Sequence, residues 1–93
     1  MSYNALKRMP LDGIRVLDLG QIYNGPYAGF LLAQAGAEVV KVEPLRGDAL
    51  RQRTRSGRDI PWAMAALNQN KRGMALDLKT GAGKALLFDL ARK

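Results

Sequence analysis

The segment from Gly13 to Glu43 constrains the fold most, because it has the length and pattern of one strand–helix–strand unit. Residues 14–19 and 38–42 are short runs rich in β-branched and aliphatic side chains, which is typical of buried parallel strands. Between them, residues 26–35 are apolar and compatible with a helix. In such units a ligand usually lies at the turn after the first strand. The segment therefore predicts an α/β fold with a ligand site near residues 20–25.

The rest of the chain continues the same alternation of helices and strands. Residues 62–67 are short, apolar and prone to form a helix, residues 74–78 predict a third strand, and residues 83–93 predict a last helix. Thr80 is expected to cap that helix. We expect its buried stripe to consist of leucines, namely Leu86, Leu87 and Leu90. This order predicts an α/β protein with a Rossmann-like parallel sheet and flanking helices.

The length of the chain indicates that this sheet is incomplete. A chain of 93 residues has room for roughly three strands and three helices, whereas a parallel sheet needs cover on both faces. We therefore expect the chain to be the amino-terminal part of a larger domain, or to complete its core with a partner. No cap or turn signal follows Lys93, which favours the first possibility. We expect residues 1–10 to be a flexible lead and residues 11–93 to form the domain.

Composition excludes several classes of site. The chain contains no cysteine and no histidine, so disulfides, thiolate metal sites and the commonest general base are absent from it. The first ten residues carry no apolar stretch of the secretory type, and no apolar run is long enough to cross a membrane. These observations predict a cytoplasmic protein with no metal and no membrane partner.

The net charge is +7, and five of the nine arginines fall in one loop-like stretch, residues 44–61. The arginines of this stretch are Arg46, Arg51, Arg53, Arg55 and Arg58. Arginine favours bidentate contact with phosphate or carboxylate, although a solvated loop explains the same composition. A non-catalytic basic module that binds nucleotides or nucleic acid is one alternative. No aromatic interleaving or recognised nucleic-acid motif supports it, so we expect no nucleic-acid partner.

Two acidic residues near the ends of predicted strands each allow two interpretations, and three residues further along the chain have structural expectations. Asp18 is either a catalytic carboxylate or an acceptor for loop amides, and the second is simpler. Glu43 either accepts ribose hydroxyls, as in dinucleotide folds, or pairs with the arginines. Asp48 and Asp59 are expected to be charge partners of the arginines, and Trp62 an anchor in the core or at a hinge. The first turn has neither the dinucleotide glycine pattern nor a P-loop, so no catalytic group is assigned from spacing.

Several blocks of the sequence resemble a known family in their order and spacing. The blocks are residues 10–19 (PLDGIRVLDL), Gly25-Pro26, residues 36–44 (GAEVVKVEP), Gly47-Asp48, residues 67–72 (LNQNKR) and residues 75–79 (ALDLK). Together they resemble the amino-terminal part of class III CoA-transferases. That family includes formyl-CoA, carnitine and bile-acid CoA-transferases of the CaiB/BaiF type, along with α-methylacyl-CoA racemase. The resemblance covers residues 10–93.

The resemblance implies a reaction whose chemistry lies outside this chain. Members of the family are longer, with a Rossmann-like large domain and a smaller domain, and two subunits interlock like links of a chain. Their catalytic aspartate forms an acyl anhydride and then a CoA thioester, and its position lies well beyond residue 93. The implied substrates are an acyl-CoA and a carboxylic acid, with CoA as a substrate and not as a tightly bound cofactor. The chain alone is then expected to be inactive.

The resemblance also implies a set of residues that contact CoA. They are Tyr23, Asn24, Arg46, Leu67, Asn68, Asn70, Lys71 and Arg72. Lys71 matches the family motif directly. Two departures count against a formyl or oxalyl substrate: Tyr23 stands where formyl-CoA transferases have glutamine, and Pro44 stands where they have arginine. Arg46 or Arg51 is then the candidate for the CoA phosphate. An acyl-CoA racemase of the same superfamily is an alternative, whose acid/base pair would also lie beyond this chain.

Overall fold

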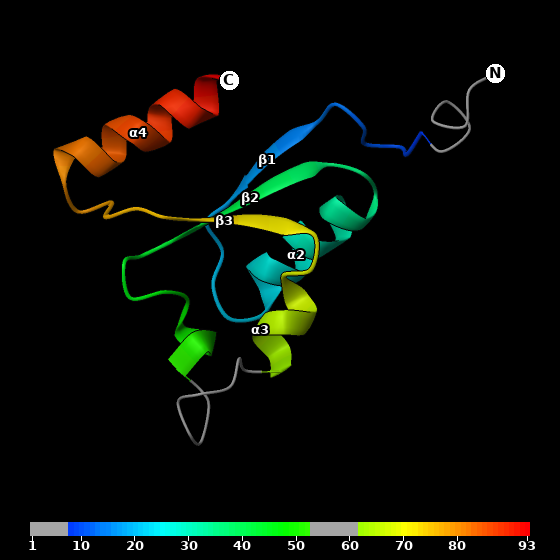
Figure 1. Ribbon diagram of the computed structural model, residues 1–93, viewed down its shortest axis with the longest axis horizontal. Coiled ribbons are helices and arrows are strands. Elements are labelled where there is room, and N and C mark those ends of the chain that lie inside the picture. The colour runs from blue at the N-terminus through cyan, green and yellow to red at the C-terminus, as the bar shows by residue number, and fades with distance from the viewer. Residues whose placement is uncertain (1–7, 53–61) are drawn as a thin grey trace.

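The computed structural model describes residues 8–52 and 62–93, and its elements alternate as the sequence predicts (Figure 1). In chain order they are β1 (Arg15–Asp18), α2 (Asn24–Gln34), β2 (Glu38–Glu43), the 3-10 helix η1 (Ala49–Gln52), α3 (Trp62–Leu67), β3 (Lys71–Ala75) and α4 (Gly81–Arg92). The two strands and the helix of the opening unit are confirmed, with ends that differ from the predicted ones by one or two residues. The helix predicted at residues 62–67 is also confirmed.

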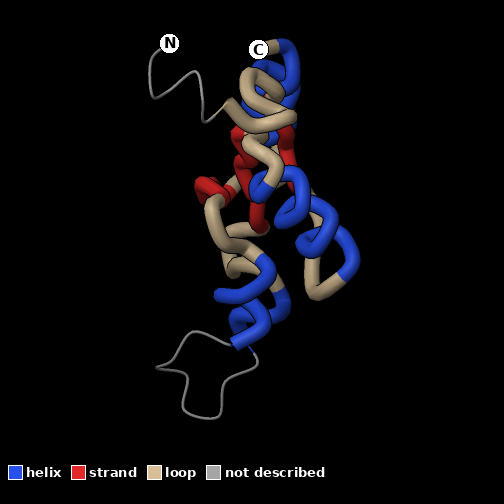
Figure 2. Tube along the Cα trace, turned by 90° about the vertical axis from the view of Figure 1, so that its right-hand side faces the viewer, coloured by secondary structure: helices blue, strands red, loops and turns tan. Residues whose placement is uncertain are grey.

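The strands form one parallel sheet in the order β1-β2-β3. Val39 lies opposite both Val16 and Lys71, which fixes the register across all three strands. Right-handed crossovers between neighbouring parallel strands place their connections on one face of the sheet. Figures 1 and 2 show α2 and α3 together on that side and α4 on the other. The predicted α/β class with a small parallel sheet is therefore confirmed.

The core lies where α2 packs on the sheet. Ala33, Ala37 and Val39 form a buried cluster, and Leu11 and Val16 pack against it. Gly36 ends the helix with a φ of +106°, a left-handed conformation that glycine adopts readily. Several large apolar side chains outside this core are exposed, including Trp62, Leu45, Phe88 and Leu86. The core is consequently small for a parallel sheet, as the chain length predicted.

The third strand occupies residues 71–75, and the prediction of residues 74–78 is wrong. It pairs with β2 from Lys71 onward, after Asn70 turns the chain with a φ of +66°. An edge strand needs little hydrophobic character, and four of these five residues are exposed. Residues 74–78 looked like a strand because most of them are apolar. Their buried member is Leu76, which lies directly after the end of β3.

Thr80 caps α4 as predicted, since its hydroxyl oxygen accepts a hydrogen bond from the Gly83 amide at 3.0 Å. The buried leucine stripe predicted for this helix is wrong. Leu86 is 53% exposed, and Leu87 and Leu90 are only partly buried, because little of the described chain packs against α4. The prediction of Trp62 as a core anchor is also wrong, because 86% of its surface is exposed at the start of α3.

Candidate functional site

The loop from Gly20 to Gly25 follows β1 at the carboxyl edge of the sheet, where α/β folds place ligands. Its two ends touch. A Cβ atom built on Gly20 would lie 2.6 Å from the Gly25 Cα, and one built on Gly25 would lie 2.7 Å from the Gly20 Cα. Between them, Ile22 has a φ of +70°, which is a strained conformation for a β-branched residue. Such a loop keeps its shape only if its surroundings hold it.

The first group that holds the loop is a buried ion pair between Asp18 and Lys71. Lys71 Nζ lies 2.7 Å from Asp18 Oδ2, and the two side chains are 2% and 6% exposed. Lys71 Nζ also donates to the Pro26 carbonyl at 2.9 Å and to Asn68 Oδ1 at 2.7 Å. Asp18 Oδ1 accepts from the Gly20 amide at 2.8 Å. The pair therefore ties β3 to the first residue of the loop and to the first turn of α2.

Gly29 makes room for this ion pair inside α2. A Cβ atom on Gly29 would lie 2.7 Å from Asp18 Oδ2 and 3.1 Å from Lys71 Nζ. Glycine in the middle of a helix is unfavourable relative to alanine by about 1 kcal/mol. At this position the missing methyl group is what lets the helix lie directly over the two charges.

A second buried ion pair, between Lys41 and Asp48, holds the same loop from the other side. Lys41 Nζ lies 2.9 Å from Asp48 Oδ2, outside hydrogen-bond geometry, and the side chains are 4% and 0% exposed. Lys41 Nζ donates to the Gly20 carbonyl at 3.1 Å. Asp48 Oδ1 accepts from the amides of Ile22 and Leu50 at 3.2 and 2.9 Å. The strained Ile22 is thus fixed through its own amide.

The surroundings of Asp48 keep it ionised. Burial removes water and by itself would raise the pKa of Asp48. The Leu50 amide, the Lys41 cation and the Ile22 amide together outweigh that effect, so the pKa of Asp48 lies below its ordinary value. Asp48 is therefore a charged structural acceptor at neutral pH.

The simpler interpretation of Asp18 is confirmed, since it accepts a loop amide. The prediction that arginines are the charge partners of Asp48 is wrong, because its partner is Lys41. Sequence reasoning did not predict this Lys41 pair. The signal for it is a lysine within an apolar strand, since a buried charge requires a partner. Asp59, with Arg53, Arg55 and Arg58, lies outside the described residues.

Glu43, at the end of β2, forms the ion pair with arginine that one interpretation predicted. Arg51 Nε lies 2.9 Å from Glu43 Oε1 and 3.1 Å from Glu43 Oε2. The glutamate side chain is 11% exposed, so its carboxylate is engaged by the arginine and largely covered. This arrangement matches a salt bridge at the strand end and leaves Arg51 itself about half exposed.

Three of the predicted CoA-contacting residues lie exposed in the segments that follow β1 and β2. Tyr23 is the N-cap residue of α2, Asn24 is the first residue of that helix, and Arg46 lies in the loop after β2. The side chain of Gln52 donates to the Arg46 carbonyl at 3.0 Å, which links that loop to η1. Tyr23 and Asn24 lie within the loop that the two buried ion pairs hold, and Arg46 lies two residues before Asp48 in the chain.

The remaining predicted residues occupy different environments. Leu67 is half-buried at the end of α3, Asn70 is exposed, and Asn68 donates from Nδ2 to the Met64 carbonyl at 2.9 Å. Because side chains alternate along a strand, Arg72 points to the face opposite to Lys71. There it pairs with Glu38 at 3.5 Å. The structure therefore separates Lys71 and Arg72, which the sequence motif places side by side.

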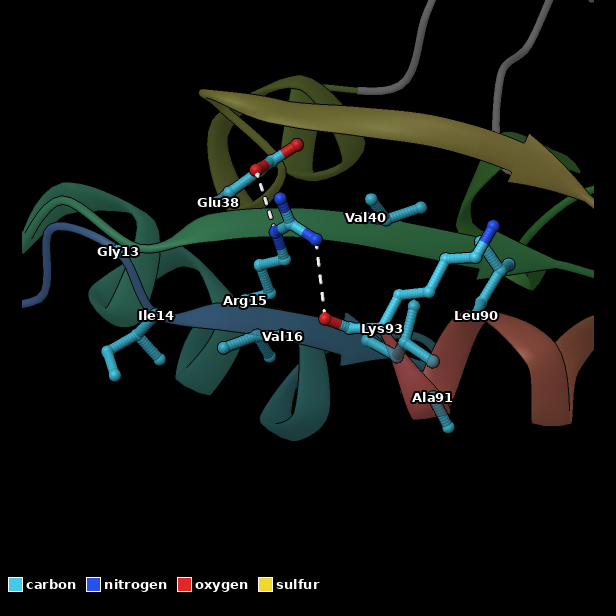
Figure 3. A pocket seen from close by; sticks show the side chains of 10 residues that line it. Gly13, Ile14, Arg15, Val16, Glu38, Val40, Leu90, Ala91 and Lys93 are labelled. Carbon is cyan, nitrogen blue, oxygen red and sulfur yellow. Dashed lines mark hydrogen bonds and ion pairs between the residues drawn. The ribbon is translucent and has the colours of Figure 1, made fainter.

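A groove of about 730 Å³ lies between that opposite face and the end of α4 (Figure 3). It is lined by Gly13, Ile14, Arg15, Val16, Leu17, Glu38, Val40, Leu90, Ala91 and Lys93. Arg15 spans it, pairing with Glu38 at 3.7 Å and donating to the Lys93 carbonyl at 3.3 Å. No predicted CoA-contacting residue lines this groove.

Two negative findings apply to residues 8–52 and 62–93. They contain no group of three or more acidic side chains placed to hold a metal ion. No helix among them is both long and apolar enough to cross a membrane.

Comparison with known proteins places the chain among enzymes of one kind. The family model described as CoA-transferase family III matches residues 11–93. The succinyl-CoA–D-citramalate CoA-transferase of Chloroflexus aurantiacus is 46% identical over 82 residues, which cover 84% of this chain and 20% of that enzyme. The formyl-CoA:oxalate CoA-transferase of Streptomyces avermitilis is 44% identical over 84 residues, which cover 89% and 20%. The chain thus spans about a fifth of the length of these curated relatives.

Two solved structures share the fold described above. A hypothetical protein from Mycobacterium tuberculosis superposes with a TM-score of 0.82 and 40% identity, over 90% of this chain and 23% of that one. A CaiB/BaiF family protein from Brucella suis superposes with a TM-score of 0.80 and 34% identity, over 87% and 23%. The small sheet and its flanking helices are therefore an arrangement that larger proteins also contain.

Proposed function

Because the chain belongs to CoA-transferase family III, we propose that it supplies the amino-terminal part of an enzyme that moves CoA between an acyl-CoA thioester and a carboxylic acid. The observation that carries this proposal is the family match over residues 11–93, together with relatives whose names are those of CoA-transferases. These relatives favour neither a racemase nor a nucleic-acid-binding module. The Tyr23 and Pro44 departures still count against a formyl or oxalyl substrate.

In this proposal CoA binds at the carboxyl edge of the sheet. Tyr23 and Asn24 supply a phenol, an amide and backbone groups from the loop after β1, and the exposed Arg46 supplies a cation for a CoA phosphate. Leu67, Asn70 and Arg72 stay in the proposed set on the strength of the family resemblance alone. The half-buried Asn68 and the buried side chain of Lys71 support a contribution from behind the loop.

We place the catalytic group outside this chain, because the described aspartates are already engaged. Asp18 and Asp48 are buried in ion pairs. Asp12 accepts from the Met9 amide, Asp77 accepts from the Lys79 amide, and Asp89 pairs with Arg92. Each of these aspartates therefore has a structural contact, and the family resemblance implies a catalytic aspartate beyond residue 93. The proposed role of the chain is to bind the CoA part of the substrate.

The finer parts of the proposal follow from the family. Its substrates are an acyl-CoA and a carboxylic acid, its location is the cytoplasm, and its assembly is an interlocked homodimer. Residues 11–93 form the amino-terminal part of the Rossmann-like domain, and residues 1–10 lead into it.

Titration of CoA into the isotope-labelled chain, followed by NMR, tests the proposed site. We expect the amide signals of residues 20–25 and 44–52 to shift, and Arg46→Ala to weaken binding several-fold because a phosphate contact is lost. Arg92→Ala is the matched control, since Arg92 is an exposed arginine on α4 whose partner is Asp89. Equal losses in the two variants would show that the charge of the chain, and not a site, attracts CoA. If only the amide signals of residues that line the groove of Figure 3 shift, the proposed CoA site at the carboxyl edge of the sheet is rejected.

A further inference from the structure

We propose that the Asp18–Lys71 ion pair positions the loop from Gly20 to Gly25 for CoA binding, and that Lys71 acts on CoA only through this loop. The inference rests on the proposed function and assigns a different role to the lysine of the family-like motif. Lys71 is thus a positioning residue, not a phosphate ligand.

The contacts of Lys71 leave its ammonium group no donor for a ligand. An ammonium group has three N–H donors, and Lys71 Nζ has three acceptors at 2.7, 2.9 and 2.7 Å, namely Asp18 Oδ2, the Pro26 carbonyl and Asn68 Oδ1. The side chain is 2% exposed. Contact with a phosphate would require Lys71 to leave Asp18, and a buried carboxylate without its cation is strongly unfavourable.

The same contacts reach both ends of the loop. At its start, Asp18 Oδ1 holds the Gly20 amide at 2.8 Å, and just after its end Lys71 Nζ holds the Pro26 carbonyl at 2.9 Å. Gly29 leaves the space that the two charges occupy. Tyr23 and Asn24, the residues proposed to face CoA, lie between these two fixed points. Their placement therefore depends on the ion pair, although neither residue touches it.

Hydrogen exchange of single amides in the 93-residue chain tests the positioning role without any ligand. The Gly20 amide reports on the ion pair, and the Glu38 amide is the reference, because it donates to the Ile14 carbonyl at 2.9 Å at the other end of the sheet. In Lys71→Met we expect Gly20 exchange to rise about tenfold more than Glu38 exchange. In Asp18→Asn/Lys71→Met no unpaired charge is left, but neither the ion pair nor the contact with the Pro26 carbonyl remains, so we expect Gly20 exchange to stay raised by at least about threefold.

Two results would overturn the proposal. One is Gly20 exchange that follows Glu38 exchange in Lys71→Met, and the other is a Gly20 amide that is as well protected in the double variant, which lacks the ion pair, as in wild type. If Lys71→Met unfolds the chain, the double variant decides. In that variant, Gly20 exchange that rises more than Glu38 exchange supports the positioning role, and Gly20 exchange equal to that of wild type rejects it.

Binding of CoA and of pantetheine, which lacks the phosphates, separates the two possible roles of Lys71. Positioning predicts that Lys71→Met weakens both ligands by a similar factor, and that the double variant, which also lacks the ion pair, recovers neither. A phosphate contact predicts a loss for CoA alone, with no recovery. If the wild-type chain binds neither ligand, the proposed function is rejected, whereas the exchange experiment still decides whether the pair holds the loop.

Discussion

Replacing Gly29 by alanine is the sharpest test of how tightly α2 packs on the Asp18–Lys71 pair. In an open helix the change from glycine to alanine stabilises by about 0.8–1 kcal/mol. In α2 the added methyl carbon would lie 2.7 Å from Asp18 Oδ2 and 3.1 Å from Lys71 Nζ. Both distances are shorter than ordinary van der Waals contact with carbon, so the helix or the ion pair must shift.

The expected size of the effect follows from two opposing terms. Overpacking a tight interior costs about 1–3 kcal/mol, and separating a buried ion pair costs about 3–5 kcal/mol. The helix gain of about 1 kcal/mol offsets part of either cost. After the helix gain is subtracted, we expect Gly29→Ala to lower the free energy of unfolding by up to about 2 kcal/mol if the helix shifts, and by about 2–4 kcal/mol if the ion pair separates.

Urea unfolding of the 93-residue chain, followed by circular dichroism, measures this difference from the midpoint at constant slope. Gly81→Ala in α4 is the matched control, because a Cβ atom there meets nothing within 4 Å and no positive φ is required. We expect that variant to be as stable as wild type or more so. If Gly29→Ala were as stable as the Gly81→Ala control, the described packing of α2 on the charges would be incorrect. In Asp18→Ala the same Gly29→Ala change should no longer destabilise, because the carboxylate that the methyl group meets is gone.

Two further outcomes follow from the structure. Because the folded-state pKa of Asp48 lies below its ordinary value of 3.8, Asp48 stabilises the fold above that pH and loses this contribution as the pH falls below it. Thermal unfolding across the acid range should therefore show a smaller loss of stability on acidification in Asp48→Asn than in wild type, and identical slopes would count against the described contacts of Asp48. The 93-residue chain should transfer no CoA from succinyl-CoA to a carboxylic acid in a thioester assay, because its described aspartates are engaged in structural contacts. Measurable transfer would reject the placement of the catalytic group outside the chain.

The parts of the fold that were predictable are those encoded by local patterns. The strand–helix–strand unit follows from two aliphatic runs and a helix that ends at Gly36, and the cap of α4 follows from Thr80. β3 was misplaced because an edge strand carries a weak hydrophobic signal. The exposure of Trp62 and Leu86 was not predictable, since burial depends on what packs against a helix and not on its own sequence.

The candidate site was predictable in location but not in its internal contacts. The carboxyl edge of the sheet follows from the strand order, and Asp18 as an acceptor of loop amides follows from its place at a strand end. The partners of Lys41 and Lys71 depend on which segments the fold brings together. The motif shows Lys71 and Arg72 as neighbouring residue types, whereas strand alternation turns their side chains to opposite faces.

The two ion pairs also differ in how far they reach along the chain, which sets the order in which the loop acquires its shape. Lys41 and Asp48 are near neighbours in sequence, so their contact closes a short segment at little entropic cost. Asp18 and Lys71 are 53 residues apart and cannot meet before β3 joins the sheet. During synthesis on the ribosome, the side of the loop that faces Asp48 can form early. The side that faces α2 becomes fixed only after Lys71 has been added and β3 has joined the sheet.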